Sequence, residues 1–320
     1  MINRNYLPEG SLLHTAENRE YLSSTAGLVR AMNEGKILES TALLCDSDLC
    51  LHVDLRGIRG IIPREEAVFC RHGEELKDIA VITRVGKPVC FKVMGIDERG
   101  GEPVAILSRR AAQAECIHHS LCDLCSGDII PAKVTHLENF GAFVDVGCGI
   151  PSLLSVDSIS VSRISHPSDR LSVGDSIYVV IRSIDRLTNR IFVSMRELLG
   201  TWEENAASFS VGQTVAGIVR SVESYGIFVE LSPNLAGLAE LREGSCDRQI
   251  ATVGSYAAVY IKNIIPDRMK IKLVLIDSYN STPPLRELRY FINGDRVPHI
   301  DRWLYSPPSS PKIIETVFEE

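Results

Sequence analysis

Several familiar sequence features are absent from this chain of 320 residues. No run of apolar residues reaches the length of about 18 that a helix needs to cross a bilayer. Residues 1–11 lack the basic and then apolar pattern of an export signal. The sequence therefore predicts a cytoplasmic protein that makes no contact with a membrane.

Sequence motifs of catalysis are missing as well. The chain has no Walker loop, no dinucleotide-binding glycine pattern, no nucleophile elbow and no HExxH helix. Acidic residues are spread along the whole sequence, so a pair of carboxylates indicates nothing by itself. We therefore predict a non-catalytic protein with no catalytic residues and no cofactor.

An excess of positive charge is also absent, because the formal net charge is −7 at pH 7. This disfavours a protein that coats duplex DNA through bulk charge. It is compatible with binding to a single strand, because base stacking supplies much of that affinity. Simple solubility explains the negative charge equally well.

Cysteine is present but scattered, with nine residues in all. In a cytosolic chain such residues are small buried hydrophobes more often than halves of disulfides. One dense group has the spacing of metal ligands: Cys116, His118, His119, Cys122 and Cys125. No second CxxC pairs with the one in this group, and the segment is predicted to be a helical linker. We therefore predict no metal site.

The most informative stretch is 139–147, which reads NFGAFVDVG. From Phe143 onward, residues alternate in the way of a half-buried strand. Phe140 and Phe143 would lie on opposite faces of a regular strand, but Gly141 permits a bulge that brings both rings to one solvent-facing surface. Exposed rings favour a flat partner, and nucleic-acid bases are the usual one. Packing in the core is the alternative for these rings.

The same pattern recurs about 85 residues later, which indicates an array of like modules. The two segments align without a gap, so that Tyr225 falls on Phe140 and Phe228 falls on Phe143. The glycine turns and strands that follow the two ring pairs also match. This repeat is the strongest signal in the sequence.

These motifs resemble the RNA-binding repeat of bacterial ribosomal protein S-one, a five-stranded OB-type barrel. The middle copy carries the family pattern at Phe140-Gly141-Ala142-Phe143-Val144-Asp145, Val173-Gly174-Asp175, Ile184-Asp185 and Arg190-Ile191-Phe192-Val193-Ser194. Together with a divergent first copy, the resemblance covers about three quarters of the chain. It implies a mainly β fold of tandem OB-fold barrels joined by short helices, with an N-terminal helix and an irregular C-terminal tail.

The chain divides into segments that follow these repeats. In order, they are an N-terminal helical segment (1–34), a divergent repeat (35–110), a helical linker (111–125), a repeat (126–197), a linker (198–208), a repeat (209–277) and an aromatic, Pro-containing extension (278–320). We expect one helix from Thr15 to about Asn33 that packs on the first barrel. We expect the last segment to fold back onto the third barrel or to dock a partner.

The first repeat lacks the two rings. Its alignment with the middle repeat places Leu49 and His52 at the two ring positions. An exposed histidine on a strand is more often solvated than a ligand. We therefore predict that 35–110 is structural or faces a protein partner, and the C-terminal extension is the second candidate surface for such a partner.

The resemblance implies that both ring-bearing repeats contact single-stranded RNA. Ser152 takes the place of a family histidine in the middle repeat, and Glu240 takes it in the third, where its charge would repel phosphate. The loop 162–170 is either a phosphate contact or a solvated loop with local salt bridges. The predicted RNA-binding residues are Phe140, Phe143, Ser152, Arg163, His166, Arg170, Asp185, Arg190, Tyr225, Phe228, Lys262 and Lys270.

The sequence leaves two functions open. The first is a non-catalytic protein that stacks single-stranded RNA on exposed rings, and the resemblance implies work in translation on mRNA or the small ribosomal subunit. The second is a protein-interaction scaffold of OB-fold repeats with weak or no RNA binding. The retained ring pairs favour the first, whereas the lost histidines and the ring-free first repeat favour the second.

Overall fold

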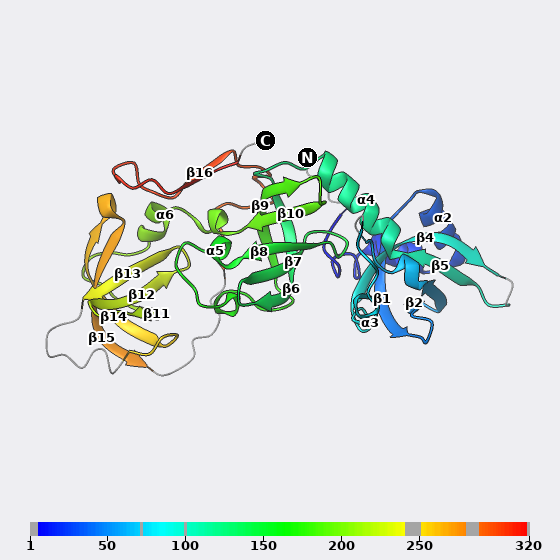
Figure 1. The fold of residues 1–320 in the computed structure, drawn as a ribbon, viewed down its shortest axis with the longest axis horizontal. Helices are drawn as coiled ribbons and strands as arrows, with labels where there is room; N and C mark the ends of the chain where they lie inside the picture. Colours follow the sequence, from blue (N-terminus) through cyan, green and yellow to red (C-terminus); the bar gives the residue numbers. More distant parts are fainter. Residues whose placement is uncertain (1–5, 71–72, 99–100, 241–250, 280–287, 319–320) are drawn as a thin grey trace.

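The computed structural model contains three closed five-stranded β-barrels that lie in a row along the molecule (Figure 1). The structure describes residues 6–70, 73–98, 101–240, 251–279 and 288–318. Tandem barrels in a mainly β chain confirm the predicted fold class. The chain passes from the first barrel through the middle barrel to the third, and then returns across the middle one (Figure 1).

All three barrels have the same strand order. The first is built of β1 Leu38–Cys45, β2 Leu51–Leu55, β3 Ile58–Ile62, β4 Pro88–Asp97 and β5 Val104–Ser108; the middle of β6 Ile129–Glu138, β7 Gly141–Asp145, β8 Pro151–Ser155, β9 Ser176–Asp185 and β10 Arg190–Ser194; the third of β11 Thr214–Val222, β12 Gly226–Ser232, β13 Leu235–Glu240, β14 Tyr256–Ile265 and β15 Lys270–Tyr279. In each barrel the third strand pairs parallel to the fifth, and the other pairs are antiparallel.

Side chains along β7 alternate between the core and the outer surface of the middle barrel. Ala142 and Val144 are fully buried in the core of the middle barrel, and Phe143 between them points to the outside. The long first strand of each barrel contains a bulge at the same place, which lies between Val134 and His136 in β6. A bulge increases the local coiling of a strand, which helps one strand to close a small barrel.

Short helices flank the barrels. The expected single N-terminal helix is two helices, α1 Ala16–Leu22 and α2 Thr25–Asn33, because Ser23 ends the first and Ser24 Oγ caps the second by accepting from Gly27 N. The remaining helices are α3 Asp78–Ile82, α4 Arg109–Cys122, α5 Val156–Ile159 and α6 Trp202–Ala206, with 3-10 turns at Arg64–Glu66, Pro167–Asp169, Arg196–Leu199 and Pro266–Arg268. None of the helices that the structure describes is long and apolar enough to cross a membrane.

The N-terminal segment joins the first barrel to the middle one. Glu9 is buried and forms a bidentate ion pair with Arg109 at the start of α4, with Nε–Oε1 and Nη2–Oε2 distances of 2.7 and 3.0 Å. The backbone N–H of Glu9 donates to Asp145 Oδ2 of the middle barrel at 2.7 Å. Leu7 O accepts from Cys148 N at 2.9 Å. Helix α4 runs alongside this contact from one barrel to the next (Figure 1).

A buried charge cluster joins the middle barrel to the third. Arg170 of the middle barrel forms an ion pair with Glu230 on β12. Glu230 also accepts from Arg220 Nε at 2.6 Å, and Arg220 reaches back to Asp169 Oδ2 at 3.2 Å. Arg170 and Glu230 are both nearly inaccessible to solvent. Buried and mutually paired charges therefore hold the two barrels together.

The C-terminal extension folds back onto the third barrel and continues onto the middle one. Its hairpin consists of β16 Arg302–Leu304 and β17 Glu315–Val317. Trp303 and Tyr305 pack in the core of the third barrel, and Phe318 packs with Ile129 and Val180 of the middle barrel. The extension thereby ties these two barrels together from the outside.

Candidate nucleic-acid interface

One row of side chains crosses the outer face of the middle barrel. His136 on β6 pairs with Phe143 on β7, Phe143 pairs with Leu153 on β8, and Leu153 pairs with Phe192 on β10. Residues paired directly across strands project from the same face of the sheet. None of these four side chains is buried, and Phe192 is 37% exposed. We call this row, together with the neighbouring Phe140, the ring row.

The rings in the ring row are in contact. Phe140 is 55% exposed, and its ring meets that of Phe143 edge to face, with centroids 6.0 Å apart and planes at 89°. The His136 ring lies on the other side of Phe143 at 6.5 Å and 25°, which is an offset-stacked arrangement. A Cβ at Gly141 would lie 2.5 Å from Leu154 O, so glycine is required for the close approach of β7 to β8. The structure thus places Phe140 and Phe143 on one exposed face.

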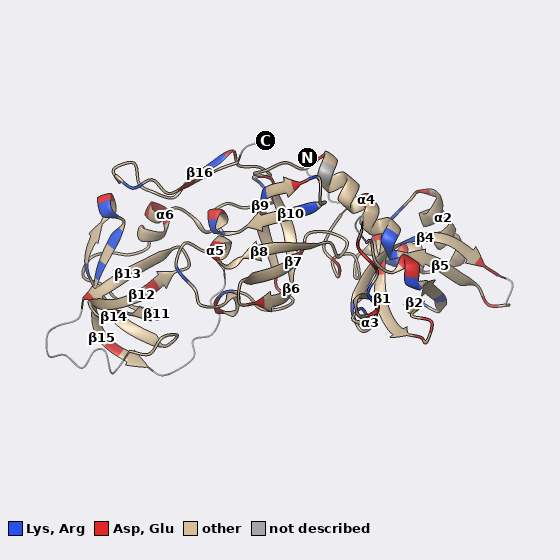
Figure 2. Cartoon of the chain, viewed as in Figure 1, with Lys and Arg blue, Asp and Glu red and all other residues tan. Residues whose placement is uncertain are grey.

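Basic side chains flank the ring row on the hairpin of β9 and β10. Arg182 is exposed and lines a hollow of about 280 Å³ together with Leu153, Ser158 and Phe192. Arg190 is exposed at the start of β10. Lysine, arginine and acidic residues occur on all three barrels (Figure 2). Positive charge is therefore available at the rim of the ring row, although the protein surface as a whole carries both positive and negative side chains.

Two predicted contacts, Ser152 and Arg170, lie inside the protein and not on its surface. Ser152 is 2% exposed, and its hydroxyl donates to Ile191 O at 2.6 Å. Arg170 is 6% exposed and is neutralised by Glu230. Both positions of the prediction are corrected, because a buried side chain with an internal partner cannot reach a phosphate.

Asp185 and His166 have structural partners in the protein. Asp185 accepts from Thr188 Oγ1 at 2.5 Å and from Leu187 N at 3.0 Å, and the bond from the Thr188 hydroxyl is the main reason that its pKa is lowered. This closes the turn between β9 and β10. His166 accepts from Ser168 N at 3.1 Å and caps the 3-10 turn Pro167–Asp169.

The loop 160–170 contacts the third barrel. Val161 N donates to Asn234 Oδ1 at 2.9 Å, and Ser162 N donates to Pro233 O at 3.2 Å. Part of this loop thus holds two barrels together, and its contact with phosphate stays a prediction. Arg163 alone among its predicted contacts stays exposed.

The third barrel has a similar row with different chemistry. Phe228 on β12 pairs with Ser221 and Leu238, and Leu238 pairs with Lys272 on β15. Tyr225 is 59% exposed and meets Phe228 edge to face at 6.2 Å and 89°, which repeats the geometry of the middle barrel. The predicted contacts Lys262 and Lys270 are both exposed.

Glu240 corresponds to Ser155 and not to Ser152. Glu240 pairs with Gly226 on the neighbouring strand, and Ser155 pairs with Gly141 in the same way. The sequence alignment of this one position was therefore three residues out of register. Glu240 also forms an ion pair with Lys272 at 3.2 Å, which offsets the repulsion that we expected between its carboxylate and phosphate.

In the first barrel, aliphatic side chains replace the rings. The equivalent row consists of Leu44, His52, Ile61 and Ile106. His52 is not a freely solvated side chain, because its Nε2 lies 2.7 Å from Asp46 Oδ2 and lowers the pKa of that carboxyl. Leu44 is 48% exposed. This face is mainly aliphatic, and its one ring, that of His52, is held by Asp46.

Sequence reasoning missed His136, Arg182 and Phe192. The signal for Phe192 was available, because it alternates with the buried Ile191 and Val193 along β10. His136 follows the bulge in β6, which shifts the alternation by one residue, so its side could not be counted from the sequence.

Comparisons with known proteins agree with this architecture. Residues 124–196 match the family described as the S1 RNA binding domain. The chain is 31% identical over 233 residues to the small ribosomal subunit protein bS1 of Leuconostoc lactis, covering 70% of this chain and 52% of the relative. It is 29% identical over 234 residues to bS1 of Rhizobium meliloti (70% and 40%) and 28% identical over 278 residues to bS1 of Mycolicibacterium smegmatis (83% and 56%). The chain spans about half the length of these curated relatives.

Proposed function

Because the chain belongs to the ribosomal protein S1 family of tandem RNA-binding repeats, we propose that it binds single-stranded RNA, without catalysis, on the ring row of the middle barrel. The observation that carries this proposal is the cluster of solvent-facing rings formed by Phe140, Phe143 and His136. Rings in such a cluster leave apolar faces in water, and a stacked base removes them from it.

The perpendicular arrangement of Phe140 and Phe143 sets how bases can bind. A base that stacks on the face of one ring meets the other ring at its side, so the pair forms a corner that fixes the position of one base. His136 is 62% exposed in its side chain and offers a second stacking surface beyond Phe143. Stacking of this kind tolerates any base, because every base has a π face.

Phosphate contacts belong at the rim of this surface. Arg182 and Arg190 are exposed next to the row, and arginine binds phosphate with several hydrogen bonds in a fixed plane. Tyr225 and Phe228, with Lys262 and Lys270, give the third barrel a weaker surface of the same kind. Two connected modules then raise the affinity for one strand above that of either alone. In the cell, we propose that the RNA is mRNA in translation, with the small ribosomal subunit as the associated partner.

The test is fluorescence anisotropy of a labelled single-stranded RNA with three proteins. Wild type should bind, and the double variant Phe140→Ala with Phe143→Ala should lose about 1–3 kcal/mol for each base that no longer stacks. The matched control is Phe140→Leu with Phe143→Leu, which keeps an apolar surface but removes the π faces. Both variants should lose affinity, with circular dichroism showing that the barrels stay folded.

The leucine control decides the mechanism. If the leucine variant binds as tightly as wild type, contact is hydrophobic and stacking is the wrong explanation. If the alanine variant keeps full affinity, RNA does not bind at this row. Phosphate contacts add a second readout, because affinity should fall steeply as salt is raised.

The aliphatic face of the first barrel favours a second candidate function, in which this barrel binds a protein partner. Leu44, Ile61 and Ile106 occupy the row that carries rings in the middle barrel. Such a surface suits apolar side chains of a protein better than bases. If the wild type does not bind RNA at low salt, the scaffold function takes first place, and a pull-down of protein partners with and without Leu44→Ala tests it.

A further inference from the structure

Three side chains with metal-ligand chemistry meet where the C-terminal extension crosses the start of β6. Cys125 and Asp128 lie in the turn after α4, and His299 lies in the extension. His299 Nδ1 is 2.8 Å from Asp128 Oδ1 and 3.9 Å from Cys125 Sγ. Cys125 Sγ is 3.6 Å from Asp128 Oδ2. We propose that these three residues bind one Zn²⁺ ion.

The spacing of the three ligand atoms fits a tetrahedral ion. Bonds of about 2.0–2.3 Å at tetrahedral angles separate the ligand atoms by about 3.3–3.6 Å. The distances from Cys125 Sγ to His299 Nδ1 and to Asp128 Oδ2 are close to this range. The 2.8 Å contact of His299 Nδ1 is with the other carboxylate oxygen of Asp128, Oδ1, so an ion bound through Oδ2 would replace that contact. Three protein ligands leave the fourth position to water.

The kinds of ligand select zinc among the common cations. A thiolate, an imidazole and a carboxylate suit a borderline-soft ion, whereas Mg²⁺ and Ca²⁺ take oxygen ligands. The Cys125 thiol is not part of a disulfide and is partly accessible to solvent, so it can lose its proton to a metal.

The backbone holds His299 against Asp128. The two residues form an antiparallel β-bridge, flanked by a bond from Ile129 N to Pro298 O at 2.8 Å and one from Ile300 N to Gly127 O at 3.0 Å. Gly127 has φ of +95°, and a Cβ there would lie 2.3 Å from Ile300 O. Only glycine lets the extension come this close. The ligands from the two segments are thus positioned by hydrogen bonds that do not involve the ion.

The surroundings of the ligands match those of protein zinc sites. Asp301 Oδ1 lies 3.1 Å from His299 Nε2, on the side of the ring away from Asp128. A carboxylate there holds a proton on Nε2 and leaves the lone pair of Nδ1 for a metal. Cys125 N donates to Asp128 Oδ2 at 2.9 Å and so orients the second ligand.

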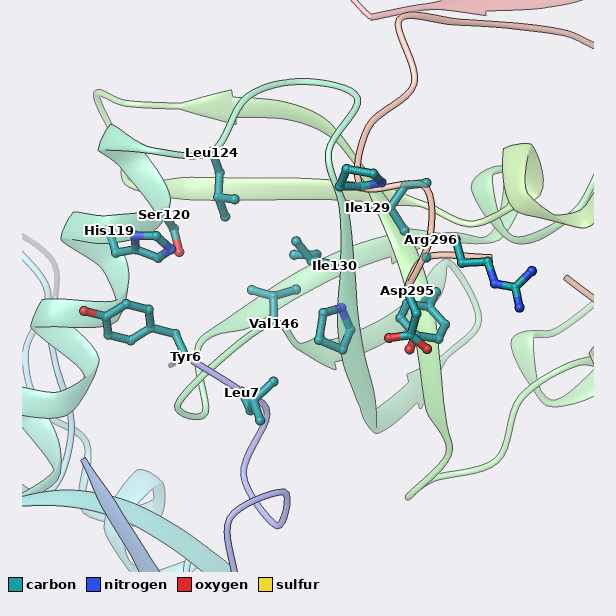
Figure 3. Close-up of a pocket in the computed structure, with 14 residues that line it drawn as sticks. Tyr6, Leu7, His119, Ser120, Leu124, Ile129, Ile130, Val146, Asp295 and Arg296 are labelled. Carbon is teal, nitrogen blue, oxygen red and sulfur yellow. The ribbon is translucent and has the colours of Figure 1, made fainter. Parts of the chain in front are cut away.

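A bound ion would fasten the extension to the middle barrel. The neighbours of the three ligands, Leu124, Ile129 and Pro298, line a cavity of about 590 Å³. Figure 3 shows Tyr6 and His119 on one side of this cavity and Asp295 and Arg296 of the extension on the other. Bound zinc would therefore hold in place the side of the cavity that the extension forms. The availability of zinc would then regulate the docking of the extension. This inference does not depend on RNA binding.

The test is a titration of the full, reduced chain with Zn²⁺ in competition with a chromophoric chelator. Wild type should bind one ion, and Cys125→Ser or His299→Ala should weaken binding at least tenfold. Asp301→Asn should weaken it about 10- to 100-fold, because Asp301 only orients a ligand. The matched control is Cys122→Ser, which removes the other cysteine of the same CxxC, an exposed thiol 3.8 Å from His118 Nδ1. This control should bind like wild type.

Each other result overturns the proposal. No binding by wild type means no site, and full binding by His299→Ala means that the extension contributes no ligand. Loss in Cys122→Ser but not in His299→Ala would assign the ion to α4 alone. Co²⁺ provides a check that is independent of affinity, because a thiolate-to-cobalt absorption band should appear in wild type and vanish in Cys125→Ser. Asp301 is almost fully exposed in its side chain, so its variant stays informative even if the ligand variants unfold.

Discussion

The first and middle barrels have the same strand order and the same register, but they present different surfaces. Position for position, Phe143 and Phe192 in the middle barrel correspond to His52 and Ile106 in the first. The inward residues stay apolar in both, because they fill a core. The fold therefore depends on one face of each strand, and the other face is free to carry rings in one barrel and aliphatic side chains in another.

The carboxylate that follows the buried valine of each second strand shows the same divergence. Asp54 in the first barrel is exposed and accepts from Gly57 N of its own turn at 2.9 Å. Asp145 and Glu230, its counterparts, are buried where another part of the chain docks. This position thus caps a turn in the first barrel, caps a turn and also anchors the N-terminal segment in the middle barrel, and anchors a neighbour in the third.

The largest effect should come from removing the anchor in the third barrel. Glu230→Gln leaves the buried Arg170 without its ion-pair partner and leaves Arg220 paired with Asp169 alone, which should cost about 3–5 kcal/mol. Urea unfolding followed by tryptophan fluorescence measures it, because the chain's two tryptophans, Trp202 and Trp303, both lie in the core of the third barrel.

The matched variant for this experiment is Asp54→Asn. The Asp54 carboxylate is exposed and accepts from Gly57 N of its own turn, so its replacement by an amide should change stability by no more than about 0.5 kcal/mol. A Glu230→Gln protein that unfolds at the same urea concentration as Asp54→Asn would show that burial of this carboxylate does not hold the barrels together.

The next effect is a pH dependence at Asp145. Burial, with the nearby Glu9 carboxylate, raises the pKa of Asp145 to about 7 from 3.8, against the pull of Arg109 and three backbone N–H donors. Arg84 and Lys133 also face this group. Between about pH 4 and 7 the folded chain keeps a proton that the unfolded chain releases. Its stabilising contribution is complete below pH 4 and is lost as pH rises to 7.

Comparison with Asp145→Asn isolates this contribution. The variant cannot titrate, so the stability of wild type relative to it should fall by at most about 1.4 kcal/mol per pH unit across this window. Calorimetric melting of both proteins between pH 4 and 8 measures the difference, and Asp54→Asn serves as the exposed counterpart. A constant difference between wild type and Asp145→Asn would mean that Asp145 is ionised throughout.

Features that depend on nearby residues could be predicted from the sequence. The barrels follow from a repeated local pattern, and the pairing of Phe140 with Phe143 follows from the glycine between them. Residues whose surroundings come from distant parts of the chain could not be predicted. Ser152 is covered by a residue 39 positions away and Arg170 by one 60 positions away, and Asp128 meets His299 across 171 positions.

The pairing register of the strands could not be predicted from the sequence either. Ser152 and Glu240 were equated because each stood near the place of a polar family residue, although counting from Gly141 and Gly226 gives Ser155 as the counterpart of Glu240. The bulge in β6 changes the exposed face at His136 for the same reason, since a shift of one residue exchanges the two faces of a strand.

The smallest effect on RNA affinity should come from the first barrel. Leu44→Ala with Ile106→Ala removes two side chains of the aliphatic row at the register positions of His136 and Phe192. If bases stack on rings, RNA affinity in the anisotropy experiment should stay within about twofold of wild type, because aliphatic side chains provide no stacking face. A loss as large as that of the Phe140 and Phe143 variant would mean that RNA lies across both barrels through apolar contact. The rings would then not be the feature that distinguishes the middle barrel from the first in RNA binding.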